Sequence, residues 1–150
     1  MKTLSQQNDK QEVLRRIAKL KADQTRRWGK MSCHQMVVHL SDSLLCPMGE
    51  RAASRASVPV PRGVYRWVAL YIPVQWPHGI ATRPEMEQGV GGTQPVEFSR
   101  DREKLVTLIG RFTHDRFEWA EHPMFSAMSE KDWMRWGYLH CDHHLRQFGV

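Results

Sequence analysis

The stretch S-E-K-D-W-M-R-W-G-Y-L-H-C-D-H-H-L-R-Q, residues 129–147, decides the fold. It opens with Ser129, and Asp132 follows three residues later, a capping pattern that marks the start of a helix. No alternating strand pattern of useful length occurs here or elsewhere in the chain. We therefore predict a helix over Glu130–Gln147, which the C-terminal Phe-Gly-Val ends.

A second stretch, S-C-H-Q-M-V-V-H-L-S-D-S-L-L at residues 32–45, carries the same kind of signal. Ser32 and Gln35 match a capping box. Val37, Leu40 and Leu44 recur at the spacing of one helix face. These features predict a helix over Cys33–Leu45.

Two further helices are predicted from apolar stripes, over Asn8–Ala22 with Asn8 as the N-cap and over Ser99–Ala120. Residues 47–97, between the predicted helices over 33–45 and 99–120, are rich in proline and glycine. One short helix near Val64–Ile72 interrupts this region. We expect an all-α fold, a four-helix bundle in which a long irregular connection joins the second and third main helices. Residues 1–150 are expected to form a single domain.

Composition limits the function classes. The 150 residues are 41% hydrophobic and 25% charged, the balance of a globular protein. No run approaches the roughly 20 apolar residues needed to span a bilayer, and the polar N-terminus lacks a secretory signal, so we expect a cytoplasmic protein. The three cysteines form no C-x-x-C pair, which argues against a disulfide framework or a cysteine zinc cluster.

The net charge of +6 comes from the N-terminal segment. The first 30 residues hold nine basic and three acidic residues, whereas the rest of the chain is balanced. Such a segment can meet nucleic acid or another anionic surface. No nucleic-acid motif accompanies it, so a solvated helix face is the simpler interpretation.

Histidines on the last predicted helix suggest a metal site. His140 and His144 lie about 40° apart around a helix, one turn above the other, and such a pair can share one ion. His143 lies about 60° to the other side of His140 and is a poorer ligand. Gly137, one turn below the pair, leaves room for a ligand or water, and nearby Trp133 and Trp136 are expected to wall the pocket.

His39, in the middle of the helix over 33–45, is the candidate third ligand. Three histidines from two helices suit an ion with an open coordination position. An all-imidazole set fits zinc, nickel, copper or iron and disfavours magnesium or calcium. Asp42, about 60° round the helix from His39, is a candidate to orient a ligand or accept a proton, and a solvated helix acid is the alternative.

These elements resemble the DinB/YfiT-like superfamily of four-helix-bundle metalloenzymes. Its members carry one ligand histidine on the second helix, matched by His39 in S-C-H-Q-M-V-V-H-L-S-D, and an H-x-x-x-H pair on the last helix, matched by His140 and His144. The run H-P-M-F-S-A-M-S at 122–129 is similar to one subgroup of that superfamily, which usually has glycine where Ser126 stands. This departure affects a turn rather than the ligands.

The resemblance implies a divalent transition metal, zinc or nickel first and iron second, bound by His39, His140 and His144. It also implies a thiol S-transferase that uses a low-molecular-weight thiol, with metal-dependent hydrolysis of a small molecule as the second reaction. The competing hypothesis is a non-catalytic helical module whose basic N-terminal helix contacts an anionic partner such as nucleic acid. No membrane partner is expected, and an exposed helix face would allow a homodimer.

The long connection over 47–97 is the only segment able to cover a site in the bundle. We expect it to pack across one end and to border the metal pocket with Tyr65, Trp67, Tyr71 and Trp76. The remaining histidines have simpler interpretations: His122 belongs to a turn, whereas His34, His78 and His114 lie at the surface or its boundary.

Overall fold

A computed structural model describes all 150 residues and shows an all-α chain. Two isolated bridges, between Gln88 and Gly92 and between His122 and Ser126, are the only β-type pairings. The expected all-α class is therefore confirmed. The helices are α1 (Gln7–Ala18), α2 (Cys33–Leu45), α3 (Arg62–Tyr71), the 3-10 helix η1 (Pro84–Met86), α4 (Phe98–His114) and α5 (Glu130–Gln147).

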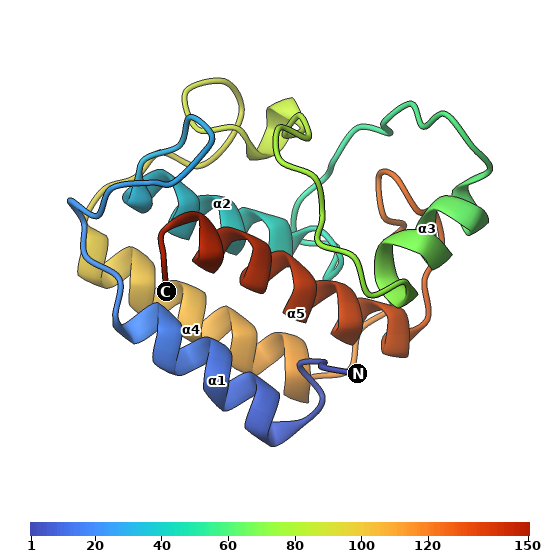
Figure 1. The fold of residues 1–150 in the computed structure, drawn as a ribbon, viewed down its shortest axis with the longest axis horizontal. Helices are drawn as coiled ribbons and strands as arrows, with labels where there is room; N and C mark the ends of the chain where they lie inside the picture. Colours follow the sequence, from blue (N-terminus) through green and yellow to red (C-terminus); the bar gives the residue numbers. More distant parts are fainter.

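Four of the helices lie side by side, as Figure 1 shows. Helix α2 packs on α4 and α5, and α1 packs on the same two helices from the other side. The shorter α3 contacts α5 alone among the main helices, and η1 contacts α2. Helices α5 and α2 thus join the main helices to the long connection.

Helices α2 and α5 begin and end where the sequence predicts, because complete capping boxes define their starts. The Ser32 hydroxyl accepts a hydrogen bond from the backbone N–H of Gln35, whose side chain accepts from the N–H of Ser32. Ser129 and Asp132 make the same reciprocal pair. Each box satisfies two backbone donors that a helix start otherwise leaves unpaired.

Helix α1 differs from its predicted limits at both ends. It begins at Gln7, so Asn8 lies inside the helix and is not its N-cap. The preceding segment is drawn onto α5, where the backbone N–H of buried Leu4 donates to the carbonyl of Met134. The helix ends at Ala18 rather than Ala22, and contacts with other elements therefore set both ends.

Helix α4 also ends earlier than predicted, at His114 rather than Ala120. The chain beyond it is extended and turns Trp119 into the protein. The Trp119 ring lies 5.2 Å from that of Phe112 and 6.1 Å from that of Trp133. Trp119 is partly buried, and the packing of this large ring against the core outweighs continuation of an exposed helix.

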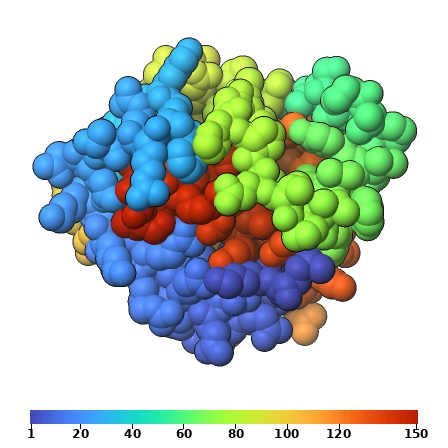
Figure 2. Space-filling model, in the orientation of Figure 1, coloured from blue at the N-terminus to red at the C-terminus, as the bar shows by residue number.

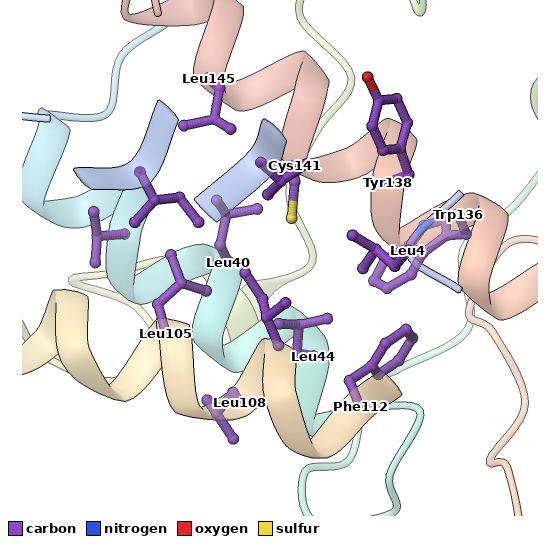
Figure 3. Close-up of a cluster of buried hydrophobic side chains, with 14 of the residues drawn as sticks. Leu4, Leu40, Leu44, Leu105, Leu108, Phe112, Trp136, Tyr138, Cys141 and Leu145 are labelled. Atoms are coloured by element: carbon purple, nitrogen blue, oxygen red, sulfur yellow. The ribbon is translucent and has the colours of Figure 1, made fainter. Parts of the chain in front are cut away.

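A single apolar cluster joins the helices, and Figure 3 shows part of it. Gly137 of α5 belongs to this cluster, which corrects its predicted role beside the ligands. A Cβ atom there would lie 2.8 Å from Leu4 and 3.1 Å from Phe112. The missing side chain therefore admits the N-terminal segment and α4, and it provides no room for a ligand.

No helix in the structure combines the length and the apolar character needed to cross a membrane.

Helix α3 is held by one fully buried side chain. It covers Arg62–Tyr71, close to the predicted Val64–Ile72, and only Leu70 among its residues is buried. Val64, Trp67 and Val68 are exposed. Leu70 is therefore the one fully buried contact of α3, and hydrogen bonds from Tyr71 to Asp132 and from Arg135 to the Leu70 carbonyl add to its attachment.

We expect Leu70→Ala to lower the free energy of unfolding by about 2–5 kcal/mol, because it removes a fully buried side chain and leaves a cavity. Urea unfolding measures this change. Val64→Ala, on the exposed face of the same helix, is the control and should cost under about 0.5 kcal/mol. Equal effects of the two substitutions would contradict this account of α3.

Candidate metal centre

The three predicted ligands converge although they come from helices about a hundred positions apart. His39 lies in the middle of α2, and His140 and His144 lie one turn apart on α5. One ring nitrogen from each histidine lies within 4.8 Å of those of the other two. His39 and His144 are buried, and His140 is partly buried.

The distances suit a single ion. The Nε2 atoms of His39 and His140 are 3.3 Å apart. Two nitrogens bound at about 2.0–2.1 Å to one tetrahedral ion lie roughly 3.3–3.4 Å from each other. The chemistry of the donors agrees, because three imidazoles form a common site for zinc, nickel or iron. The residues present therefore fit a divalent transition metal.

Hydrogen bonds to the opposite ring nitrogens orient two of these imidazoles. His39 Nδ1 lies 3.1 Å from the carbonyl oxygen of Met86, so it donates and leaves Nε2 as the free acceptor. His144 Nδ1 lies 3.0 Å from Oε1 of Gln147. The amide of Gln147 donates in turn to the carbonyl of Trp28. Such partners fix ring orientation in metal sites.

Burial keeps the three rings neutral. It lowers the pKa of His39 and, together with the neighbouring histidines, lowers the pKa values of His140 and His144 well below the ordinary value. A neutral imidazole presents the lone pair that a metal needs. The same burial makes protonation of the three rings unfavourable. Their nitrogen lone pairs therefore remain free to bind a metal ion.

A cavity of about 460 Å³ opens beside the triad. It lies between α5 and the long connection, and Figure 2 shows the green residues of that connection next to the red residues of α5. Tyr65 and Trp76 line it as predicted, together with Trp133 and Trp136. The long connection therefore does border the site.

Two aromatic residues predicted to border the pocket do not. Trp67 is 56% exposed and points away from the cavity lining. Tyr71 donates a hydrogen bond from its hydroxyl to Asp132, at the start of α5. Their helix turns only one side toward α5, and that side carries Tyr65, Val68 and Ala69 into the cavity wall.

Asp42, the tentative catalytic residue, is fully buried and lies outside the cavity lining. Its carboxylate accepts hydrogen bonds from the backbone N–H and the hydroxyl of Thr93, at 2.8 and 2.7 Å. It also lies 3.2 Å from the Arg51 guanidinium. This arrangement favours a positioning role for Asp42: it anchors the segment that brings Met86 to His39, and the solvated alternative is excluded.

The other histidines do not belong to the triad, although the ring centroid of His143 lies 5.2 Å from that of His144. His143 faces Trp28, with ring centroids 6.0 Å apart, and His78 stacks on the same indole at 4.0 Å. His34 pairs with Asp101. His114 is exposed, as predicted.

His122 belongs to a turn, as predicted, and its Nδ1 accepts from the N–H groups of Met124 and Phe125. Ser126 closes this turn with a φ of 60°, a conformation that glycine adopts at less cost. The position where the resembling subgroup has glycine is thus a left-handed turn residue.

Sequence reasoning assigned no role to three groups beside the triad. The Ser43 hydroxyl lies 3.5 Å from Nε2 of His39 and lines the cavity. Its spacing of four residues from His39 could have indicated it. Gln147 follows His144 at the equally informative spacing of three, whereas the Met86 carbonyl leaves no trace in a side-chain pattern.

Cys46 also lines the cavity, but its chemistry is that of a buried thiol. Burial raises its pKa to about 11, and the thiol donates to the carbonyl of Arg51. At neutral pH it is protonated and therefore a poor nucleophile. Cys46 is therefore not a candidate nucleophile of this cavity.

Fold and site together define an all-α protein with a buried three-histidine centre beside an apolar cavity. A family model described as "Protein of unknown function (DUF1569)" matches residues 2–149, and the chain belongs to this family. No curated protein and no solved structure matches it.

Acid should destabilise the protein through His122. Burial lowers the pKa of His122 to about 3, whereas an unfolded histidine titrates near 6.5. Between these values the unfolded chain binds more protons, so this contribution to stability is complete above about pH 6.5 and is lost as the pH falls toward 3.

We expect His122→Asn to flatten the acid side of a plot of unfolding free energy against pH, because the amide oxygen can still accept the turn N–H groups but does not titrate. Urea unfolding from pH 4 to pH 8 measures this. His114→Asn, at an exposed site, is the control and should leave the slope unchanged. An unaltered slope in His122→Asn would contradict the assignment.

Asp42→Asn should lower both stability and metal affinity. Loss of the charge weakens the contacts to Thr93 and Arg51 and should cost about 2 kcal/mol or more in unfolding free energy. Zinc affinity should fall about tenfold or more, because the segment carrying Met86 loosens. Asp142→Asn, whose carboxylate pairs with Arg16 away from the cavity, is the control for affinity. Wild-type stability and affinity in Asp42→Asn would contradict the positioning role.

Proposed function

We propose that this protein is a metal-dependent enzyme in which His39, His140 and His144 hold one divalent transition-metal ion. The observation that carries the proposal is the convergence of three neutral ring nitrogens at the base of a cavity. A chance cluster of solvated histidines would repel on protonation and would not be buried together. The orienting hydrogen bonds that His39 and His144 donate to Met86 and Gln147 further support a ligand role.

The fold supports the proposed relationship to DinB-like bundles. Helices α1, α2, α4 and α5 are the four that pack in neighbouring pairs, and they would correspond to the four bundle helices. The ligands then lie on the second and fourth of these, as the resemblance implies. Helices α3 and η1 would be additions within the long connection.

A divalent ion bound there would supply a Lewis acid able to lower the pKa of a bound water or thiol toward neutrality. Zinc or nickel fits the imidazole set best, with iron next. Around it, the Ser43 hydroxyl can donate to or accept from a ligand, and Trp136 and Trp76 flank His140 and limit access of bulk water.

The proposed reaction is S-transfer: the thiolate of a low-molecular-weight thiol forms a C–S bond to a small electrophilic substrate, the bond to the leaving group of that substrate breaks, and the thiol proton passes to water. Hydrolysis, with water in place of the thiol, is the second candidate. No residue of α1 lines the cavity, so the basic helix does not supply the binding site for such a thiol. The charged helix α1 packs on a different side of α5 from the cavity.

The non-catalytic binding module explains less. Arg16, on the basic helix, is engaged by Asp142 and Glu12 within the protein. That hypothesis gives no reason for three histidines to be desolvated together. Metal-free protein with steeply salt-dependent binding to nucleic acid would favour it.

Untagged protein should purify with, or take up, about one zinc or nickel ion per chain, measured by elemental analysis. His140→Ala should abolish tight binding, since it removes one of three ligands. His143→Ala is the matched control, because His143 lies on the same helix but is not a proposed ligand. This variant should retain binding near one ion per chain. Loss of metal from both variants, or from neither, would contradict the proposed ligand set.

A further inference from the structure

We infer that the cavity beside the triad takes a small molecule with an uncharged, apolar body and a single polar group directed at the histidines. The inference rests on the proposed function for the role of that polar group. Binding of the apolar body does not require the ion, and it can be tested separately.

The first argument for an uncharged ligand comes from the charges around the cavity. Its lining contains no aspartate, glutamate or lysine, and Arg83 is the one arginine. The Arg83 guanidinium donates from Nη2 to the hydroxyl of Ser54, and its Nε has no partner. A ligand with several carboxylate or phosphate groups would lose its hydration and meet only this one cationic side chain, which is unfavourable.

The second argument, for an apolar body, comes from the cavity walls, which are built from aromatic and aliphatic side chains. The indole N–H of Trp76 donates to the carbonyl of Ala69, so this ring turns carbon atoms rather than a free donor toward a ligand. Phe125, Trp136 and Met86 complete the wall near the triad. The three histidines, with Ser43 and Gln147 beside them, provide one cluster of polar atoms where a single head group would lie.

The third argument comes from the entrance of the cavity, where apolar side chains are exposed. Val68, Val74 and Ile80 line the cavity and are nevertheless exposed to solvent. All three belong to the long connection, whose green part lies next to the red residues of α5 in Figure 2. Exposed apolar side chains around an opening indicate a binding site rather than ordinary surface. The volume of about 460 Å³ lies within the range of pockets that hold drug-sized ligands.

An uncharged fluorescent dye, N-phenyl-1-naphthylamine, tests the inference on metal-free protein. We expect it to bind and to be displaced by primary alkanols from butanol to octanol. Each added methylene should tighten binding about fourfold, which corresponds to ~0.8 kcal/mol. Alkanoates of the same chain lengths should displace the dye less well. Absence of dye binding, or affinity independent of chain length, would overturn the inference.

Two valines on different helices provide a matched pair. Val68 is 40% exposed at the entrance, and Val106 is 41% exposed on α4 outside this cavity. Val68→Glu should weaken dye binding at least tenfold, whereas Val106→Glu should leave it unchanged. Equal effects would overturn the placement of the entrance.

Elemental analysis of the same samples separates the two proposals. Protein that binds the dye and the longer alkanols but takes up no metal would contradict the proposed function and leave the apolar site supported. Protein that takes up one ion and shows no preference for apolar chains would contradict the inference alone.

Discussion

The close approach of three uncharged imidazoles is the constraint on which the rest of this structure depends. His39 and His140 place their Nε2 atoms 3.3 Å apart, a distance that two protonated rings would not tolerate in a buried site. The register between α2 and α5 must therefore be held to a fraction of a helix turn. Two capping boxes define where these helices start, and the shared apolar cluster holds them together.

The long connection between α2 and α4 has a second constraint, centred on a buried charge. Asp42 lies on the same helix as His39, and its carboxylate is satisfied by Thr93 and Arg51. Those contacts bring the Met86 carbonyl to Nδ1 of His39. A carboxylate that the sequence marks as reactive thus serves to shape the site. The same connection supplies the apolar walls, so one segment both orients a ligand histidine and forms the cavity.

Sequence patterns predicted the structure correctly wherever the interactions that fix it lie close together along the chain. The capping residues and apolar stripes of α2 and α5 predict their ends because the hydrogen bonds involved span only three or four residues. The i,i+4 spacing places His140 and His144 on one face for the same reason. Where a distant partner decided the outcome, the prediction was wrong: α4 stops at His114, and the chain beyond it packs the partly buried Trp119 against Phe112 and Trp133.

By itself, then, the sequence determined the all-α class, two helices in full and the histidines that share a face, since these follow from backbone geometry within one helix. Only the tertiary structure decided that Gly137 packs against Leu4, that Asp42 holds a loop and that Trp67 points away from the cavity. Each of these depends on which distant surface a side chain meets. That meeting is set by the packing of whole helices, and no spacing along the chain encodes it.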